Sequence, residues 1–122
     1  MDDRKQIMVV EDDLTIRQLM AEILREAGHE VVECATGEEA LSCLDSTHPA
    51  VITLDLAMPS MDGVEFLRAL RQRDDTARVA VVVVTAAPEF LRQELAVEGH
   101  STLGKPFHMD QLLDAVEQAL HL

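Results

Sequence analysis

The sequence predicts a doubly wound α/β domain, built on a five-stranded parallel sheet with the strand order 2-1-3-4-5. Three observations lead to this prediction. Short apolar runs alternate with segments of helical periodicity along the chain. The run at 79–84 is continuously apolar and mostly β-branched, which is typical of a strand covered on both faces. The chain has 122 residues, enough for five strand–helix units but about half of what a (β/α)₈ barrel needs.

The part of the chain before residue 55 is expected to contain three strands and two helices. The strands are the apolar runs at 7–10, 31–35 and 50–54. Between the first two, apolar residues recur every three or four positions over 16–27, and Gly28 follows at a position suited to a helix C-cap. Thr36 and Glu39 have the spacing of a capping box, which predicts a second helix running through Leu44.

The part of the chain after residue 55 is expected to contain three helices and two strands. Asp62 is placed to cap a helix that carries Phe66, Leu67 and Leu70 on one face. Pro88 suits the first turn of a weaker helix. The strands are 79–84, expected in the middle of the sheet, and 101–103, and a last helix carries apolar residues from 109 to 120. Five strand–helix units result, and right-handed crossovers place helices on both faces of the sheet.

Composition and charge exclude several classes of function. Apolar residues make up 48% of the chain and charged residues 27%, as in a globular protein. The formal net charge of −13 would repel nucleic acids and anionic membranes, so we expect no binding to either. Cys34 and Cys43 are expected to be reduced thiols, and no apolar stretch resembles a signal peptide or a membrane span. Together these features predict a cytoplasmic protein.

Polar residues follow four of the predicted strands. Glu11 and Asp12 come after the first strand, Asp55 after the third, Thr85 after the fourth and Lys105 after the fifth. In an open parallel sheet, ligands bind beyond the carboxyl ends of the strands, near the point where strand order reverses. The predicted strand order therefore brings three carboxylates, a hydroxyl and an ammonium to one edge.

This set of groups predicts phosphoryl chemistry with a divalent cation. Three neighbouring carboxylates repel one another, and Mg²⁺ (or Mn²⁺), which prefers oxygen ligands, would remove that conflict. With the cation and Lys105 balancing the charge, Asp55 could accept a phosphoryl group, and Thr85 could donate a hydrogen bond to it. The expected product is an aspartyl phosphate.

These motifs resemble the receiver domains of response regulators in two-component signalling, the chemotaxis-Y-like family. The matching segments are 9–13, 55–63, 85–86 and 105–107. The resemblance covers essentially the whole chain and implies a flavodoxin-like (βα)₅ fold. We therefore expect residues 1–122 to form a single receiver domain with no output domain.

The resemblance also implies a role for individual residues. Asp55 would take a phosphoryl group from a phosphohistidine of a sensor histidine kinase or a histidine phosphotransfer protein. Asp12 and Asp55 would bind the metal directly, Glu11 through a water molecule, and Ala57 through its backbone carbonyl. The peptide bond before Pro106 would be cis and would help to aim the neighbouring lysine. The domain would act by changing its contacts with a downstream protein whose identity the sequence does not give.

One position departs from the family pattern. Receiver domains usually carry a tyrosine or phenylalanine three residues before the lysine, whereas this chain has Thr102. A threonine cannot move a ring between buried and exposed positions. We expect the phosphorylation chemistry to be retained. Without the aromatic residue, we expect the conformational signal to pass through the loop after Thr85 and the helix beginning at Pro88.

The same residues also fit other interpretations. The chain could be a receiver excised from a larger regulator or hybrid kinase. An Asp-nucleophile phosphatase would use the same carboxylate and metal, but it needs an acid/base aspartate two residues after the nucleophile, where this chain has Ala57. We therefore expect a signalling domain that assists only its own phosphotransfer and aspartyl-phosphate hydrolysis. Asp13 is expected to cap the first helix rather than to bind metal.

Overall fold

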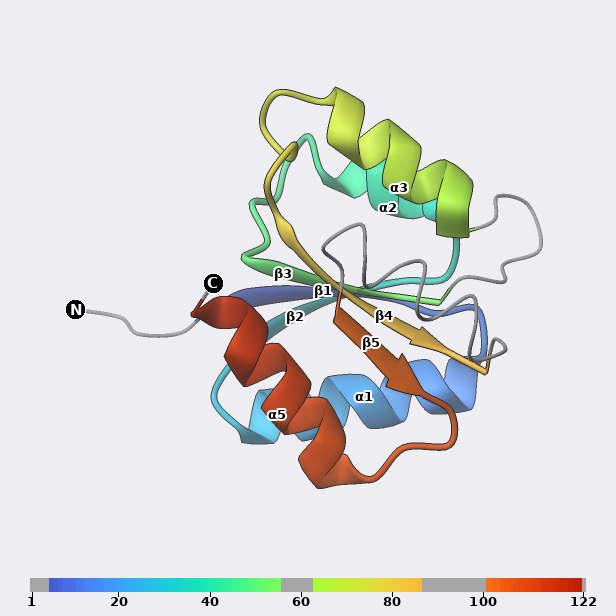
Figure 1. Cartoon of the computed structure of the whole chain (residues 1–122), viewed down its shortest axis with the longest axis vertical. Coiled ribbons are helices and arrows are strands. Elements are labelled where there is room, and N and C mark those ends of the chain that lie inside the picture. Colours follow the sequence, from blue (N-terminus) through green and yellow to red (C-terminus); the bar gives the residue numbers. More distant parts are fainter. Residues whose placement is uncertain (1–4, 56–62, 87–100, 122) are drawn as a thin grey trace.

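A parallel sheet of five strands, in the order β2-β1-β3-β4-β5, runs through the middle of the molecule (Figure 1). The structure is a computed structural model, drawn as a ribbon in Figure 1. It describes residues 5–55, 63–86 and 101–121. The strands are β1 (Gln6–Val10), β2 (Glu30–Cys34), β3 (Val51–Leu54), β4 (Ala80–Thr85) and β5 (Ser101–Gly104). Every neighbouring pair is parallel, so the predicted fold class and strand order are confirmed.

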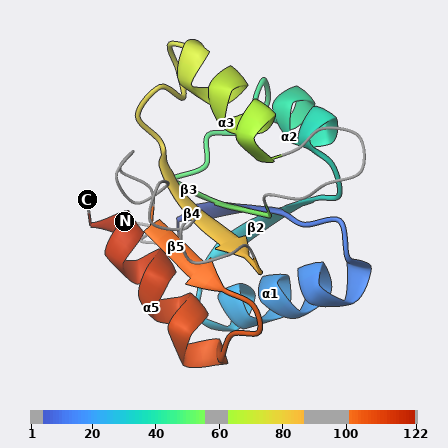
Figure 2. The same ribbon diagram turned by 45° about the vertical axis from the view of Figure 1, so that its right-hand side comes forward.

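Helices cover both faces of this sheet. They are α1 (Leu14–Glu26), α2 (Gly37–Cys43), α3 (Gly63–Gln72) and α5 (Met109–Leu120). Figures 1 and 2 show α1 and α5 side by side on one face, with α2 and α3 on the other. The helix expected from Pro88 and the cap expected at Asp62 lie outside the described residues. None of the described helices is long and apolar enough to cross a lipid bilayer.

The core consists of two apolar layers, one on each side of the sheet. Side chains alternate along the strands, so Met8 and Val10 face α2 and α3 while Ile7 and Val9 face α1 and α5. Strand β4 contributes to both layers, because Val81 and Val83 belong to the first and Val82 and Val84 to the second. The continuously apolar run is thus an interior strand between β3 and β5, as predicted.

The helix caps follow the signals in the sequence. The Asp13 side chain accepts a hydrogen bond from the Ile16 amide at 3.0 Å, so its predicted capping role is confirmed. Gly28, just after the end of α1, has a φ of 98°, a left-handed conformation that favours glycine. At α2, the Thr36 hydroxyl accepts from the Glu39 amide at 3.0 Å. These caps fix where each helix leaves the sheet.

Strand boundaries differ from the predicted ones by about one residue. Strand β2 begins at Glu30 rather than at residue 31 because Glu30 pairs with Gln6 in the β1–β2 ladder. Strands β4 and β5 each extend one residue further because Thr85 pairs with Gly104. Backbone pairing decides these ends, and a polar residue can pair as well as an apolar one.

Candidate functional site

The carboxyl ends of β1, β3 and β4 bring the predicted site residues together. The register pairs Val10 with Leu54 and Leu54 with Val83. The residues that follow β1 and β3 are Glu11 and Asp55, and they leave the sheet next to each other. The backbone confirms this, because the Asp55 amide donates a hydrogen bond of 3.0 Å to the Val10 carbonyl.

Three carboxylates form a compact acidic cluster at this edge. Glu11, Asp12 and Asp55 each offer an oxygen, and these atoms lie within 4.8 Å of one another. Glu11 is 1% exposed and Asp55 7%, whereas Asp12 lies open to solvent. Oxygen ligands at this spacing suit a hard divalent cation, and an exposed member leaves room for water or a further ligand on the metal.

Lys105 supplies the positive charge of the site. Its Nζ lies 2.6 Å from Oε1 of Glu11 and 3.6 Å from Oδ2 of Asp55. Partial burial lowers the pKa of Lys105, but the hydrogen bond to Glu11 and the charges of both carboxylates raise it further, so the pKa lies above its usual value. The side chain is therefore an ammonium ion at neutral pH. This charge balances one carboxylate charge, so three ionised carboxylates would leave a net charge of −2 for a divalent cation to balance.

Asp12 is held in its charged form. Burial raises the pKa of the Asp12 carboxyl, but hydrogen bonds with Asp55 and Glu11, its own backbone and the charge of Lys105 lower it more. The pKa of Asp12 thus lies below its usual value. An ionised, exposed carboxylate beside two buried ones is the group that a cation arriving from solvent meets first.

Thr85 closes the site on the side of β4. It is 4% exposed and ends its strand, and its backbone carbonyl accepts a hydrogen bond of 3.0 Å from the Lys105 amide. The peptide bond between Lys105 and Pro106 is cis. The backbone of β4 therefore holds the start of the loop that carries the lysine.

Two residues outside the predicted site contact the backbone of Glu11. Arg17 donates a hydrogen bond of 3.0 Å from its guanidinium to the backbone carbonyl of Glu11. The Cys34 carbonyl accepts a bond of 3.0 Å from the Glu11 amide. Periodicity gives no sign of these contacts, because both depend on where β2 and α1 lie relative to the end of β1.

Comparison with known proteins identifies the family. Residues 7–117 match the family model for the response regulator receiver domain, which is most of the chain. The chain belongs to the response regulator receiver family. It is a receiver domain of two-component signalling, as its site motifs predicted.

Some relatives of this receiver domain match it along nearly the whole of their own length. Sporulation initiation phosphotransferase F of Bacillus subtilis is 28% identical over 118 residues, which cover 97% of this chain and 95% of that protein. Chemotaxis protein CheY of Listeria monocytogenes is 30% identical and covers 93% of this chain and 96% of its own length. Among solved structures, chemotaxis protein CheY4 of Vibrio cholerae is 31% identical with a TM-score of 0.88, covering 96% of this chain and 99% of that one.

Two further predictions concern positions around the site of this receiver domain. Thr102, in place of the usual aromatic residue, is half-buried in the middle of β5 and pairs with Val83. Ala57, whose carbonyl was expected to bind metal, lies outside the described residues. The helix from Pro88, expected to carry the signal, lies outside them as well, so both remain predictions.

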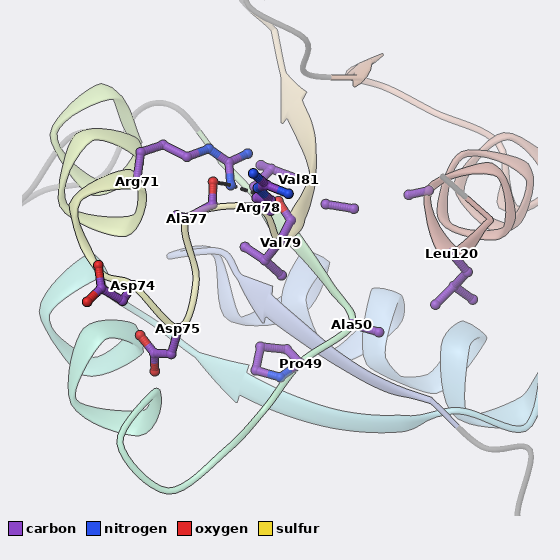
Figure 3. Close-up of a pocket in the computed structure, with 12 residues that line it drawn as sticks. Pro49, Ala50, Arg71, Asp74, Asp75, Ala77, Arg78, Val79, Val81 and Leu120 are labelled. Carbon is purple, nitrogen blue, oxygen red and sulfur yellow. Dashed lines mark hydrogen bonds between the residues drawn. The ribbon is translucent and has the colours of Figure 1, made fainter.

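A separate hollow lies at the opposite end of the sheet. It measures about 570 Å³, and residues before β3 and at the start of β4 line it, among them Pro49 and Ala80. Figure 3 shows Arg71 reaching the connection between α3 and β4, where it donates to the carbonyls of Ala77 and Val79 at 3.3 and 2.8 Å. These bonds hold the connection in place, so we assign Arg71 a structural role.

Proposed function

We propose that Asp55 of this receiver domain accepts a phosphoryl group from a phosphohistidine on a sensor histidine kinase or a histidine phosphotransfer protein. One observation carries the proposal: the Asp55 carboxylate lies at the meeting point of two further carboxylates and the Lys105 ammonium. An isolated aspartate would repel an incoming phosphoryl group. The positive charges of Lys105 and a bound cation would make the approach of the phosphoryl group to Asp55 favourable.

The transfer needs few groups from the protein. An Asp55 oxygen forms the new O–P bond while the N–P bond of the phosphohistidine breaks, and the imidazole keeps the electron pair and takes up a proton from solvent. Lys105 is placed to pair with an oxygen of the transferred group, and the Thr85 hydroxyl is proposed to donate a hydrogen bond to another.

The donor set fits magnesium, and manganese would serve equally. We propose that Asp12 and Asp55 bind the metal directly and Glu11 through a water molecule, with the Ala57 carbonyl as a further ligand. Three carboxylate oxygens within 4.8 Å support this assignment, because Mg²⁺ prefers oxygen ligands and retains several waters. When bound, the cation neutralises charge on the phosphoryl oxygens.

Intact mass spectrometry tests the proposal directly, since the chain has no tryptophan to serve as a fluorescence reporter. The protein is incubated with a small phosphodonor such as acetyl phosphate, with and without Mg²⁺. We expect a gain of one phosphoryl group only with Mg²⁺, and none in Asp55→Asn. Asp114→Asn, which changes an exposed aspartate of α5, is the matched control and should be modified like the wild type.

A wild-type protein that is folded and still gains no mass from the small donor would next be tested with a phosphorylated histidine phosphotransfer protein. Failure with both donors would overturn the proposal. Mass gain in Asp55→Asn would instead place the acceptor at another residue.

The wider role of the domain is part of the same proposal. We propose that phosphorylation changes its contacts with a downstream protein, and that the domain catalyses no reaction on a separate substrate. Two relatives consist almost entirely of the matched region, which covers 95% and 96% of their lengths, and this supports a role for the region as a receiver domain in its own right. Its two free thiols fit a cytoplasmic protein. An immunoblot of the native protein from cells distinguishes a receiver domain that acts alone from one within a longer chain, because the longer chain would have a larger apparent mass.

A further inference from the structure

We propose that Arg17 is a positioning residue for the metal site, acting through the peptide that joins Glu11 to Asp12. This inference rests on the proposed function of the site as a metal centre. Arg17 lies on α1. At the metal site it contacts the backbone between Glu11 and Asp12 rather than the carboxylates of these residues.

The position of Arg17 is unusual for a long cationic side chain on a helix. Arginine on a helix surface normally extends its charge into water, whereas the Arg17 side chain is only 15% exposed. It turns back toward the sheet and donates to the Glu11 carbonyl at 3.0 Å. That carbonyl belongs to the peptide unit whose amide is that of Asp12, so the bond orients the link between two of the three acidic residues.

A second contact keeps the guanidinium in place. Nε of Arg17 lies 3.6 Å from Oε1 of Glu33 on β2, and Glu33 is also paired with Arg25 at 3.2 Å. The charge of Arg17 is thus balanced by a carboxylate outside the metal site. Arginine's planar donor fork can make both contacts at once, which the single ammonium of lysine does less well.

Asp12 depends on this bond more than its neighbours do. Glu11 is held by three other contacts, because its amide donates to Cys34 and its carboxylate accepts from the Asp13 amide at 3.2 Å and from Lys105. Asp12 is exposed, and its side-chain hydrogen bonds are with Asp55, Glu11 and its own backbone, all within the cluster itself. The Arg17 bond holds the Asp12 peptide from outside the cluster. Release of that peptide should therefore weaken metal binding while leaving the reacting groups in place.

Titration of the metal-free protein with Mn²⁺, followed by electron paramagnetic resonance of the free ion, measures this effect without any phosphorylation. We expect Arg17→Gln to raise the dissociation constant about tenfold, the lower end of the effect for groups that orient metal ligands. Arg25→Gln is the matched control, because Arg25 is also a partner of Glu33 but makes its other described contact with the Val31 carbonyl on β2. The affinity of this variant should stay within about twofold of the wild type.

The phosphorylation rate distinguishes positioning from loss of structure. In Arg17→Gln, the Mg²⁺ concentration for half-maximal rate with acetyl phosphate should rise about tenfold, while the rate at saturating Mg²⁺ changes less than about threefold. Circular dichroism checks the fold. Arg17→Lys, which keeps the charge, should recover part of the affinity and carries the test if Arg17→Gln does not fold.

Wild-type affinity in a folded Arg17→Gln protein would overturn the inference. Asp12→Asn separates this outcome from failure of the proposed function. If Asp12→Asn loses metal binding and Arg17→Gln does not, the metal site stands and the role of Arg17 is wrong. If the wild type binds no metal, both the proposed metal centre and the inference are wrong.

Discussion

At the scale of single residues, Glu11 and Lys105 form a short and largely buried ion pair. Glu11 is almost fully buried, and a buried carboxylate costs stability unless it is paired. The Lys105 ammonium, 2.6 Å away, pairs with the Glu11 carboxylate and is itself only one-fifth exposed. The same ammonium is proposed to contact the phosphoryl group, so one side chain serves both stability and chemistry.

Removal of that ammonium should destabilise the metal-free protein. We expect Lys105→Met to lower the free energy of unfolding by roughly 1–3 kcal/mol, because it leaves a buried carboxylate without its charged partner. Urea denaturation in the presence of a chelator measures the change. The double variant Glu11→Gln with Lys105→Met should be less destabilised than Lys105→Met alone, and equal losses would show that the pair does not form in solution.

Cys34 makes stability depend on pH in the alkaline range. Burial, with a smaller contribution from neighbouring Cys43, raises the pKa of Cys34 to about 12. Above the pKa of the unfolded thiol, near 9, the unfolded chain loses this proton while the folded chain keeps it. The unfolded state is then favoured, so stability falls as pH rises through this interval.

Denaturation by urea at pH 7.5 and pH 10, under reducing conditions, tests this dependence. The wild type should lose more stability between the two values than Cys34→Val, by at most about 1.4 kcal/mol per pH unit for one proton. Cys43→Ser, which leaves the buried thiol in place, should behave like the wild type. The same loss in Cys34→Val would assign the pH dependence to other groups.

At the scale of secondary-structure elements, the first turn of α1 is joined to the acidic cluster. Asp13 caps the helix through its side chain, while its own amide donates to the Glu11 carboxylate at 3.2 Å. The helix therefore begins at a fixed distance from the site. A change in the cap alters the helix start and the loop together.

Loss of the cap should cost stability. We expect Asp13→Ala to lower the free energy of unfolding by about 0.5–2 kcal/mol, and Asp13→Asn to retain most of it because asparagine also caps helices well. Thermal or urea denaturation followed by circular dichroism gives both values. An Asp13→Ala protein as stable as the wild type would mean that solvent satisfies the Ile16 amide equally well.

At the scale of the whole molecule, the acidic character of the chain makes bound cation a source of stability. The formal charge of −13 is concentrated further where three carboxylates meet. We expect Mg²⁺ to raise the melting temperature, by an amount equivalent to about 2.7 kcal/mol at one hundred times its dissociation constant. Removal of Mg²⁺ with a chelator should reverse the gain.

The ionic strength must be matched in that measurement, because any salt screens repulsion in so acidic a protein. Sodium chloride of equal ionic strength is the control for the wild type, and Asp12→Asn should respond to Mg²⁺ no more than to sodium. A response in Asp12→Asn as large as in the wild type would place the stabilising cation elsewhere.

Much of this architecture could be predicted from the sequence because its signals are local. Alternating apolar runs and helical periodicity gave the strand order, and the strand ends gave Glu11, Asp12, Asp55, Thr85 and Lys105 as neighbours. Contacts such as that of Arg17 could not be predicted, since a long side chain can reach in many directions. The start of β2 at Glu30 depends on backbone pairing with Gln6 of another strand. The residue types within β2 do not indicate this pairing.

The contact between Glu11 and Lys105 joins residues 94 positions apart in the chain. During synthesis the three acidic residues leave the ribosome well before the lysine that balances them. Lys105 follows β5, the last strand in the chain, which lies beside β4 at one edge of the sheet, so the cluster gains its ammonium only after most of the domain has been synthesised. A nascent or truncated chain that ends before residue 105 would present the acidic groups without this counter-charge, and competence for phosphorylation would coincide with the completion of folding.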